Sequence, residues 1–412
     1  MNYEFFIAKR IIGSKSYKSS VSAPIIKIGI TAIAIGIIVM LIAIATGIGL
    51  QKKVREKVVA FNGHITINHF DTNESNESLM PISTIQPFYP KFNSVEGVKH
   101  IQGVATKFGV IRTETDFEGI VLKGVGSDYD WSYVKDFLIE GELPTYEGEL
   151  SNDVVISSYL ANRLNFELGD SFQTVFGKES IEDIPFQRNF KIVGIFNSGF
   201  QDIDKTFMIG DLSHIQRMNK WEQTQIGNFE VFLDDFTQLI PIEQQVRAKT
   251  PSFLDTQTIE EKFATTFEWI KIFDNNTYGI IAIMIIVAGI NMITALLVLI
   301  LERTQMIGIL KALGSSNWSV RKVFLYNATY LIGLGLLWGN LIGLGLLFIQ
   351  QQFSVLKFPD PEQYYVSVIP VYISIDYIIL LNIGTFFACL VMLLIPSVII
   401  TKISPVKAIR FE

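Results

Sequence analysis

The residues of this sequence that could do chemistry are few and lie far apart. The single cysteine, Cys389, can form neither a disulfide nor a cysteine-based zinc site. No H-E-x-x-H or G-x-S-x-G motif occurs, and Gly177-Lys178 lacks the upstream glycine of a P-loop, so we expect no ATPase site in this chain. The other candidates are isolated histidines and pairs of acids typical of helix starts or solvated faces: His64, His69, His100, His214, Asp234-Asp235 and Glu260-Glu261. We therefore expect a chain that is not an enzyme and that binds neither a metal nor a cofactor.

One stretch does have a spacing that predicts a function. In residues 302–322 apolar side chains interleave with basic ones. The pattern predicts a short amphipathic helix that stops at Gly314, followed by a serine-capped turn. A loop that only reversed the chain would need a few polar residues, whereas this helix carries four large aliphatic side chains: Ile307, Ile309, Leu310 and Leu313. Such a helix suits either the groove of a partner protein or the surface of a membrane.

The segments that would position this loop are those of a membrane protein. Of the 412 residues, 49% are hydrophobic and only 18% are charged, and the mean hydropathy is +0.35. Four windows contain no Asp, Glu, Lys or Arg, and each can cross a hydrocarbon core of ~30 Å as a helix: residues 28–50, 277–301, 323–356 and 377–401. The window at 28–50 is longer than the ~7–15 residues of the apolar core of a signal peptide. We therefore expect that it is not cleaved and remains as a membrane anchor.

Charge divides the chain into two parts. Residues 51–276 carry 21 basic and 34 acidic side chains, a formal charge of −13, whereas the remainder carries 13 and 6, a formal charge of +7. Basic residues precede the first window, occupy 302–322 and follow the last window. The positive-inside rule therefore predicts that both termini and that loop are cytoplasmic and that 51–276 lies outside. The basic cluster at 52–57 lies on the predicted outer side, against the positive-inside rule. We discount it, because long loops cross the membrane largely regardless of charge.

The outer segment has the pattern of a mixed α+β domain. Short alternating or β-branched runs predict strands at 64–68, 154–156, 171–176, 190–196 and 229–233. Ser157 is expected to cap the first of several helices, near 158–164, 211–218 and 235–248. We expect two subdomains, with helical stretches that continue the first two spans outward at 51–61 and 258–273.

The windows themselves contain little polar chemistry. The absence of charged residues argues against a secondary transporter driven by an ion gradient. Gly335, Gly339 and Gly343 recur at every fourth position and predict close helix packing within one subunit. Four amides are expected to bond between helices: Asn291, Asn327, Asn340 and Asn382. Aromatic and aliphatic residues among the lysines of the first 18 residues predict an amphipathic helix on the inner leaflet.

These features resemble the MacB/FtsX superfamily of ABC transporter permeases over the whole chain. The loop is similar to that family's coupling helix, whose pattern runs roughly E-[RK]-x-x-E-I-[GA]-[IV]-L-[KR]-[AT]-x-G-A. Further matches lie at 49–53, 63–67, 160–170, 193–196 and 405–412. The sequence departs from the pattern at Met306, where the family usually has an acid, so one polar contact to the ATPase is not expected here.

The resemblance implies an α-helical membrane protein with four transmembrane helices and a large extracytoplasmic α+β domain inserted between helices 1 and 2, a type VII ABC permease. It would be a multi-pass protein of the inner membrane of a Gram-negative bacterium. The implied segments are an amphipathic N-terminal helix at 1–27, spans at 28–50, 277–301, 323–350 and 377–401, the periplasmic domain with its stalk helices at 51–276, the coupling loop at 302–322, a short periplasmic loop at 351–376 and a cytoplasmic tail at 402–412.

Within the superfamily, the length of the outer domain and residues 358–367 are most similar to the lipoprotein-releasing permeases LolC and LolE. Such a permease extracts lipoproteins from the inner membrane and hands them to a periplasmic carrier by mechanotransmission. The implied partners are a cytoplasmic ABC ATPase dimer that binds ATP and Mg, a second permease subunit that is identical or homologous, the lipoprotein, the carrier and membrane lipid, without nucleic acid. Two alternatives stay open: a MacB-like efflux or antimicrobial-peptide export permease, and an FtsX-like regulator of a periplasmic hydrolase.

The resemblance also implies three sets of site residues. Coupling to the ATPase is expected from Ile309, Leu310, Leu313, Gly314 and Trp318. An apolar chamber for the lipoprotein is expected from the outer halves of the first two spans, at Met40, Ile44, Ile48, Tyr278, Ile281 and Ile285. A hairpin that binds the carrier is expected at Ile184, Pro185, Phe186, Gln187 and Arg188. Ordinary core packing and an ordinary hairpin tip remain the alternatives for the last two sets.

Overall fold

The computed structural model describes residues 3–13, 22–72, 77–114, 116–177, 184–359, 364 and 366–409. Its contacts divide the chain into two compact units. We call them the helical unit, which comprises Met1–Gln51, Trp269–Lys357 and Val368–Glu412, and the α+β unit, which comprises Lys52–Glu268 and Phe358–Ser367.

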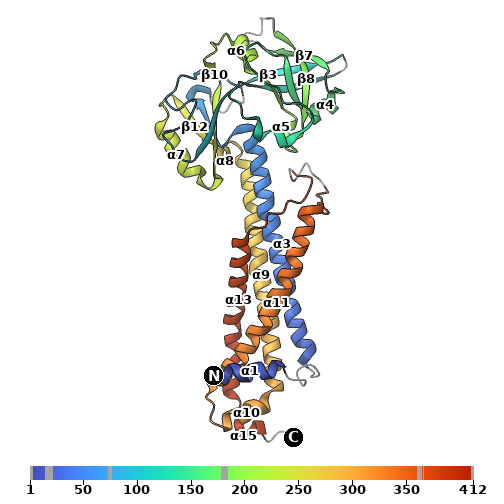
Figure 1. Cartoon of the computed structure of the whole chain (residues 1–412), viewed down its shortest axis with the longest axis vertical. Helices are drawn as coiled ribbons and strands as arrows, with labels where there is room; N and C mark the ends of the chain where they lie inside the picture. The colour runs from blue at the N-terminus through green and yellow to red at the C-terminus, as the bar shows by residue number, and fades with distance from the viewer. Residues whose placement is uncertain are drawn as a thin grey trace. The chain divides into compact units, whose positions relative to one another are not determined.

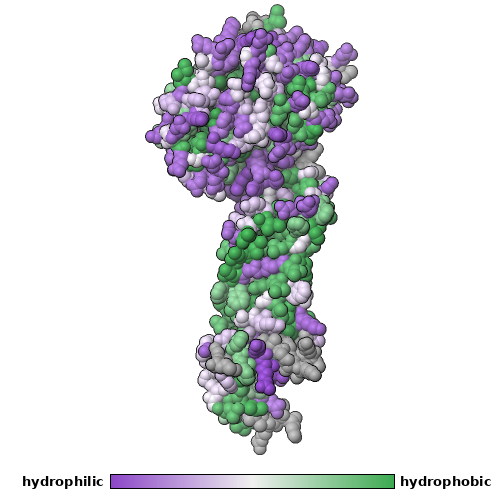
Figure 2. Space-filling model, viewed as in Figure 1, coloured by the Kyte–Doolittle hydropathy of each residue, from purple (hydrophilic) through white to green (hydrophobic). Residues whose placement is uncertain are grey.

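The helical unit is built from long apolar helices and several short ones (Figure 1). The helices are α1 (Tyr3–Gly13), α3 (Ser22–Asn62), α9 (Ala264–Glu302), α10 (Thr304–Ala312), α11 (Asn317–Phe353), α13 (Ile375–Ser397), α14 (Ile399–Lys402) and α15 (Pro405–Ile409). Within the described residues, four stretches are long and apolar enough to cross a membrane: Pro24–Asn62, Ala264–Glu302, Asn317–Phe353 and Ile375–Lys402. Hydrophobic side chains cover most of the visible surface of these helices (Figure 2).

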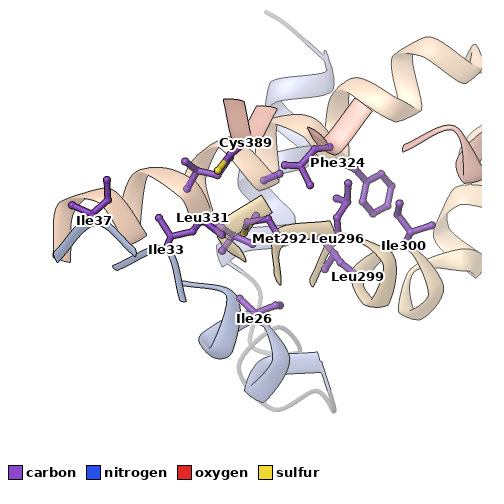
Figure 3. Close-up of a cluster of buried hydrophobic side chains, with 14 of the residues drawn as sticks. Ile26, Ile33, Ile37, Met292, Leu296, Leu299, Ile300, Phe324, Leu331 and Cys389 are labelled. Atoms are coloured by element: carbon purple, nitrogen blue, oxygen red, sulfur yellow. The ribbon is translucent and has the colours of Figure 1, made fainter. Parts of the chain in front are cut away.

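Small residues set the spacing between α3 and α11. A Cβ added at Gly335 would lie 2.7 Å from the Ile33 Cβ, and one added at Gly339 would lie 2.8 Å from the Ile37 Cβ. These distances leave no room for a side chain, so the glycines allow the two backbones to approach closely. The predicted packing role of the glycines within one subunit is confirmed. The same core continues through all four long helices, where Ile33, Met292, Leu331 and Cys389 are buried together (Figure 3).

The four amides behave differently from one another. Asn340 and Asn382 exchange two hydrogen bonds between α11 and α13, of 2.6 and 3.0 Å, as predicted. Asn291 instead donates to the Val287 carbonyl of its own helix, so the interhelical prediction was wrong there. Asn327 is fully buried, and neither of its side-chain polar atoms has a partner among the described residues. The prediction treated four similar residues alike, but only one facing pair could form the bond.

The α+β unit is organised around one large sheet and a separate two-stranded sheet formed by β2 and β10. Its strands are β1 (Ile65–His69), β2 (Ile82–Ser83), β3 (Val98–Arg112), β4 (Phe117–Val125), β5 (Leu138–Gly141), β6 (Asp153–Ser157), β7 (Ser171–Phe176), β8 (Phe186–Phe196), β9 (Phe207–Asp211), β10 (Gln225–Ile226), β11 (Asn228–Leu233) and β12 (Leu254–Thr258). Its helices are α4 (Ser158–Leu164), α5 (Gln201–Asp204), α6 (Leu212–Asn219), α7 (Leu239–Lys249) and α8 (Ile259–Lys262).

The strand pairing closes part of this sheet into a barrel. β3 pairs with β4, and the ladder continues through β9, β6, β8 and β7 back to β3. The other half of β3 pairs with β11, which carries β1 and β12. A single sheet thus runs through both halves of the unit, joined by β3, and the division into two subdomains stays a prediction.

Most of the local predictions in this unit are confirmed. Each predicted strand is present, and the Ser157 hydroxyl accepts a hydrogen bond of 3.1 Å from the Leu160 backbone N–H at the start of α4. Helix α3 continues without a break to Asn62. The stretch at 258–273 is interrupted at Phe263, because α8 ends at Lys262 and α9 begins at Ala264.

Candidate functional site

The predicted coupling helix is α10, and local hydrogen bonds define its C-terminal end and the turn that follows it. Gly314 adopts a φ of 92°, and the Ser315 N–H donates to the Leu310 carbonyl while the Gly314 N–H donates to the Lys311 carbonyl. This is the Schellman arrangement that a left-handed glycine permits. Ser316 then caps α11 by accepting from the Ser319 N–H. The predicted stop at Gly314 and the serine-capped turn are both confirmed.

The two faces of α10 have different environments. Ile307 and Leu310 are buried in the core of the helical unit. Ile309, Leu313 and Trp318 are 46%, 78% and 51% exposed. Leu310 is therefore not available to a partner, and we correct that assignment: it supports the helix from within. The exposed set Ile309, Leu313 and Trp318, with Gly314 between them, forms what we call the coupling face.

Two basic residues of this loop, Lys311 and Arg321, donate hydrogen bonds to oxygens of the same chain. Lys311 Nζ donates to the carbonyls of Ile400 and Ile403, at 2.6 and 2.8 Å. Arg321 donates to the Ser397 hydroxyl and the Leu394 carbonyl at the end of α13, while its guanidinium lies 5.1 Å from the Trp318 ring centroid. Cations are favourable at helix C-termini, where carbonyls are left without helical partners. Burial lowers the pKa of Lys311. Sequence spacing could not reveal this use of the bases, because the acceptors lie about 80 residues further along the chain.

Helix α1 packs against the first turns of α11. The Ser319 hydroxyl donates to Glu4 at 2.8 Å, and the Tyr3 and Ser315 hydroxyls are 3.3 Å apart. Ala8 and Ile11 form a small buried cluster with Val323 of α11, and Ile7 and Met306 pack against it. The departure from the family pattern at Met306 thus has a local explanation, since this side chain faces α1.

The predicted chamber residues do not share one environment. Met40 is fully buried in the core of the helical unit, so this chain does not present it to a ligand, and we correct that assignment. Ile44, Ile281 and Ile285 are half-buried and pack against the same core, and Ile48 is also half-buried. Tyr278 is 68% exposed. A small apolar recess that includes Ile44 lies between α3, α11 and the segment before α13, lined by Leu41, Ala45, Leu344, Leu347, Tyr372 and Ile378 among others.

The predicted hairpin is formed by β7 and β8. Phe186, Gln187 and Arg188 are strand residues, paired with Phe176, Val175 and Thr174. They lie on the strands of the hairpin rather than at its tip, and their role toward a carrier stays a prediction. Ile184 is 82% exposed and Pro185 is exposed in the loop before β8, whereas 178–183 lie outside the described residues.

A feature that sequence analysis missed lies beside the hairpin. Phe108 and Val110 of β3 are 46% and 41% exposed. Val110 pairs directly with Val175 of β7, so these apolar side chains lie next to the hairpin strands. The second half of β3 exposes alternate residues only in the folded structure, and its pairing with β7 depends on residues about 65 positions away.

The described residues contain no group of three or more His, Cys, Asp or Glu side chains that could hold a metal ion.

Two family models match consecutive parts of the chain. One, described as "MacB-like periplasmic core domain", matches residues 28–249, which is more than half of the chain. The other, described as "FtsX-like permease C-terminal", matches residues 278–405. The chain belongs to the MacB/FtsX superfamily of ABC transporter permeases.

Curated relatives extend this similarity over the full length. A "Lipoprotein-releasing system transmembrane protein LolC" of Xylella fastidiosa is 22% identical, covering 98% of this chain and 96% of the relative. A LolE protein of Haemophilus influenzae is 21% identical, covering 84% and 82%. The solved periplasmic region of MacB from Actinobacillus actinomycetemcomitans covers 50% of this chain and 92% of its own, at 15% identity and a TM-score of 0.34.

As a MacB/FtsX permease, the chain is a multi-pass membrane protein. The permease-like match covers most of α9 together with α10, α11, α13 and α14. The MacB-like match covers most of α3 and continues through the α+β unit to the end of α7. The resemblance at 358–367 includes 360–363 and 365, and that at 405–412 includes 410–412; these positions lie outside the described residues.

Proposed function

We propose that this chain is a permease subunit of a type VII ABC transporter that extracts lipoproteins from the outer leaflet of the inner membrane and passes them to a periplasmic carrier. The observation that carries the proposal is the full-length similarity to LolC, which spans both the membrane helices and the α+β unit. The site geometry is compatible with it, because the coupling face and the hairpin each expose apolar side chains on structured backbone.

The proposed topology has both termini and α10 in the cytoplasm and the α+β unit in the periplasm, with segments as predicted from the charge pattern. In this arrangement the coupling face docks on a cytoplasmic ATPase that binds ATP and Mg. The permease works as a dimer with an identical or homologous chain.

The energetics explain why such a machine needs ATP. Removing acyl chains from a bilayer costs ~0.8 kcal/mol per CH₂, so a lipid-anchored protein does not leave spontaneously. The apolar chamber that shelters the chains would be lined by the exposed or half-buried members of the predicted set, Ile44, Ile48, Tyr278, Ile281 and Ile285. Met40 is fully buried and is therefore not part of this chamber.

The test targets the hairpin, because hand-over to a carrier distinguishes lipoprotein release from efflux or hydrolase regulation. Ile184→Asp places a charge on an 82% exposed apolar side chain. Ile85→Asp is a matched control, since Ile85 is 80% exposed elsewhere in the α+β unit. We expect carrier pull-down to fall about tenfold, or ~1.4 kcal/mol, in Ile184→Asp only. Labelled lipoprotein should accumulate in the inner membrane, with basal ATP hydrolysis of the complex unchanged.

Two outcomes would contradict the proposal at different levels. Normal carrier binding and sorting in a folded Ile184→Asp variant would remove the hairpin from the mechanism. Normal lipoprotein sorting after depletion of the whole protein would exclude release and favour the efflux or regulator function.

A further inference from the structure

Helix α10 and helix α15 touch at their backbones. Gly308 lies in the middle of α10 and is buried, and a Cβ added there would lie 2.5 Å from the Ala408 Cβ. Ala408 is itself only 5% exposed. Real Cβ atoms do not approach this closely, so the contact requires a glycine on one side and no more than an alanine on the other.

A second contact fixes the same two segments. Lys311, one turn after Gly308, donates to the carbonyls of Ile400 in α14 and of Ile403, which lies between α14 and α15. Ile400 is fully buried in the same core as Ile307 and Leu310. α10 is therefore held against the 400–408 segment by a tight backbone contact, charge-assisted hydrogen bonds and apolar packing together.

The chain connectivity gives this contact a mechanical meaning. α10 follows α9 directly and leads into α11 after one turn, so both helices follow its movements through the backbone. α13 has no such connection to α10. The Lys311 and Gly308 contacts join α10 directly to the segment that continues α13. They act beside the route through α11, which contacts the end of α13 through Arg321 and Ser397.

We propose that α15 is a brace by which movement of the coupling helix is transmitted to α13, with Gly308, Ala408 and Lys311 as positioning residues. The inference rests on the proposed function, because it assumes that an ATPase moves α10. It adds that α13, and not only α9 and α11, responds to the movement of α10.

Gly308→Ala tests the brace with a single added methyl group. In a helix interior this substitution normally stabilises, so a loss of function would not come from helix propensity. Because the added Cβ collides with Ala408, we expect α15 to be displaced. The probe is a triacylated lipoprotein reconstituted with the complex in vesicles. Its stimulation of ATP hydrolysis should fall roughly tenfold, while the ATPase still co-purifies because the coupling face is unchanged.

The reciprocal variant supplies the rescue. Ala408→Gly removes the methyl group that the new side chain meets, so Gly308→Ala/Ala408→Gly should recover at least half of the stimulation. Gly333→Ala is the matched control, because a Cβ at Gly333 of α11 meets nothing within 4 Å. Thermal unfolding in detergent checks that all variants are folded.

Leu313→Asp separates this inference from the proposed function. A charge on the coupling face should prevent co-purification of the ATPase. If Leu313→Asp uncouples but Gly308→Ala stimulates normally, the brace is wrong and the docking stands. If Leu313→Asp has no effect, the proposed docking itself is wrong. Loss of stimulation in Gly308→Ala without rescue by Ala408→Gly would also overturn the brace.

Discussion

The two units treat buried polar groups in opposite ways. In the α+β unit, Lys123 is 1% exposed and Glu230 is 4% exposed, and they form an ion pair of 2.7 Å. Lys123 also donates to the Phe61 carbonyl at the end of α3, and Gln102 donates to Glu230. In the helical unit the buried polar groups include neutral amides, and Asn327 has no partner among the described residues.

This difference in buried polar groups follows from the surroundings of each unit, which are water for the α+β unit and lipid for the long helices. A chain that buries an ion from water must supply a counter-charge and hydrogen bonds, because the uncompensated cost is several kcal/mol per ion. Helices surrounded by lipid gain little from burying apolar groups, so packing of small residues such as Gly335 and Gly339 supplies the contact. Polar pairing should thus matter more to the stability of the α+β unit than to that of the helical unit.

The largest expected effect comes from breaking the ion pair. Lys123→Met leaves Glu230 buried without its cation and should lower the free energy of unfolding of the α+β unit by about 3–5 kcal/mol. Lys123→Met/Glu230→Leu removes both charges and should recover at least half of this loss. Hydrogen exchange of the β4 amides measures the free energy of unfolding in the single and the double variant. Equal destabilisation by the single and double variants would mean that packing, not charge, holds this site.

A smaller effect is expected from acid. Burial lowers the pKa of His64 from 6.5 to about 4, and its Nδ1 accepts a hydrogen bond of 3.1 Å from the Leu233 backbone N–H. As pH falls from 6.5 to 4, the unfolded chain binds the proton first, so stability is full above pH 6.5 and falls by about 3 kcal/mol on acidification.

His64→Asn keeps an acceptor for the Leu233 N–H but cannot titrate. Thermal unfolding of this variant should therefore depend less on pH between 6.5 and 4 than that of the wild type. An unchanged pH slope would show that His64 is not the group responsible.

The smallest effect lies in the helical unit. Asn382→Leu removes the bond pair to Asn340 and should cost about 1 kcal/mol, the usual range for interhelical bonds in membranes. Asn291→Leu is the matched control and should cost almost nothing, because Asn291 bonds only within α9. Unfolding in mixed micelles by SDS compares the two. A cost of 3 kcal/mol or more for Asn382→Leu would erase the contrast between the units.

Signals within a few residues of one another were readable from the sequence. Gly314 as a helix stop, Ser157 as a cap and the strand at 229–233 all follow from neighbouring residues, and the structure has each of them. The glycine spacing in α11 was also readable, because a helix repeats every few residues.

Partners distant in sequence were not readable. Leu310 and Ile309 are equally apolar neighbours, and only the packing of α10 against the rest of the helical unit decides which one is exposed. The barrel closure depends on β3, whose residues 101–105 are buried on both faces and so lack the alternation of an ordinary strand. The Gly308 contact with Ala408 joins residues 100 positions apart and leaves no local signal.

The left-handed backbone at Gly314 also bears on how a partner would bind. A flexible loop loses conformational entropy when it docks, at about 1–2 kcal/mol for each residue whose backbone becomes fixed. The glycine and its two hydrogen bonds already fix the turn that presents Leu313, so most of this cost is met during folding. A larger residue at position 314 would leave the docking surface chemically intact and still weaken association, since the turn would have to be ordered anew at each encounter.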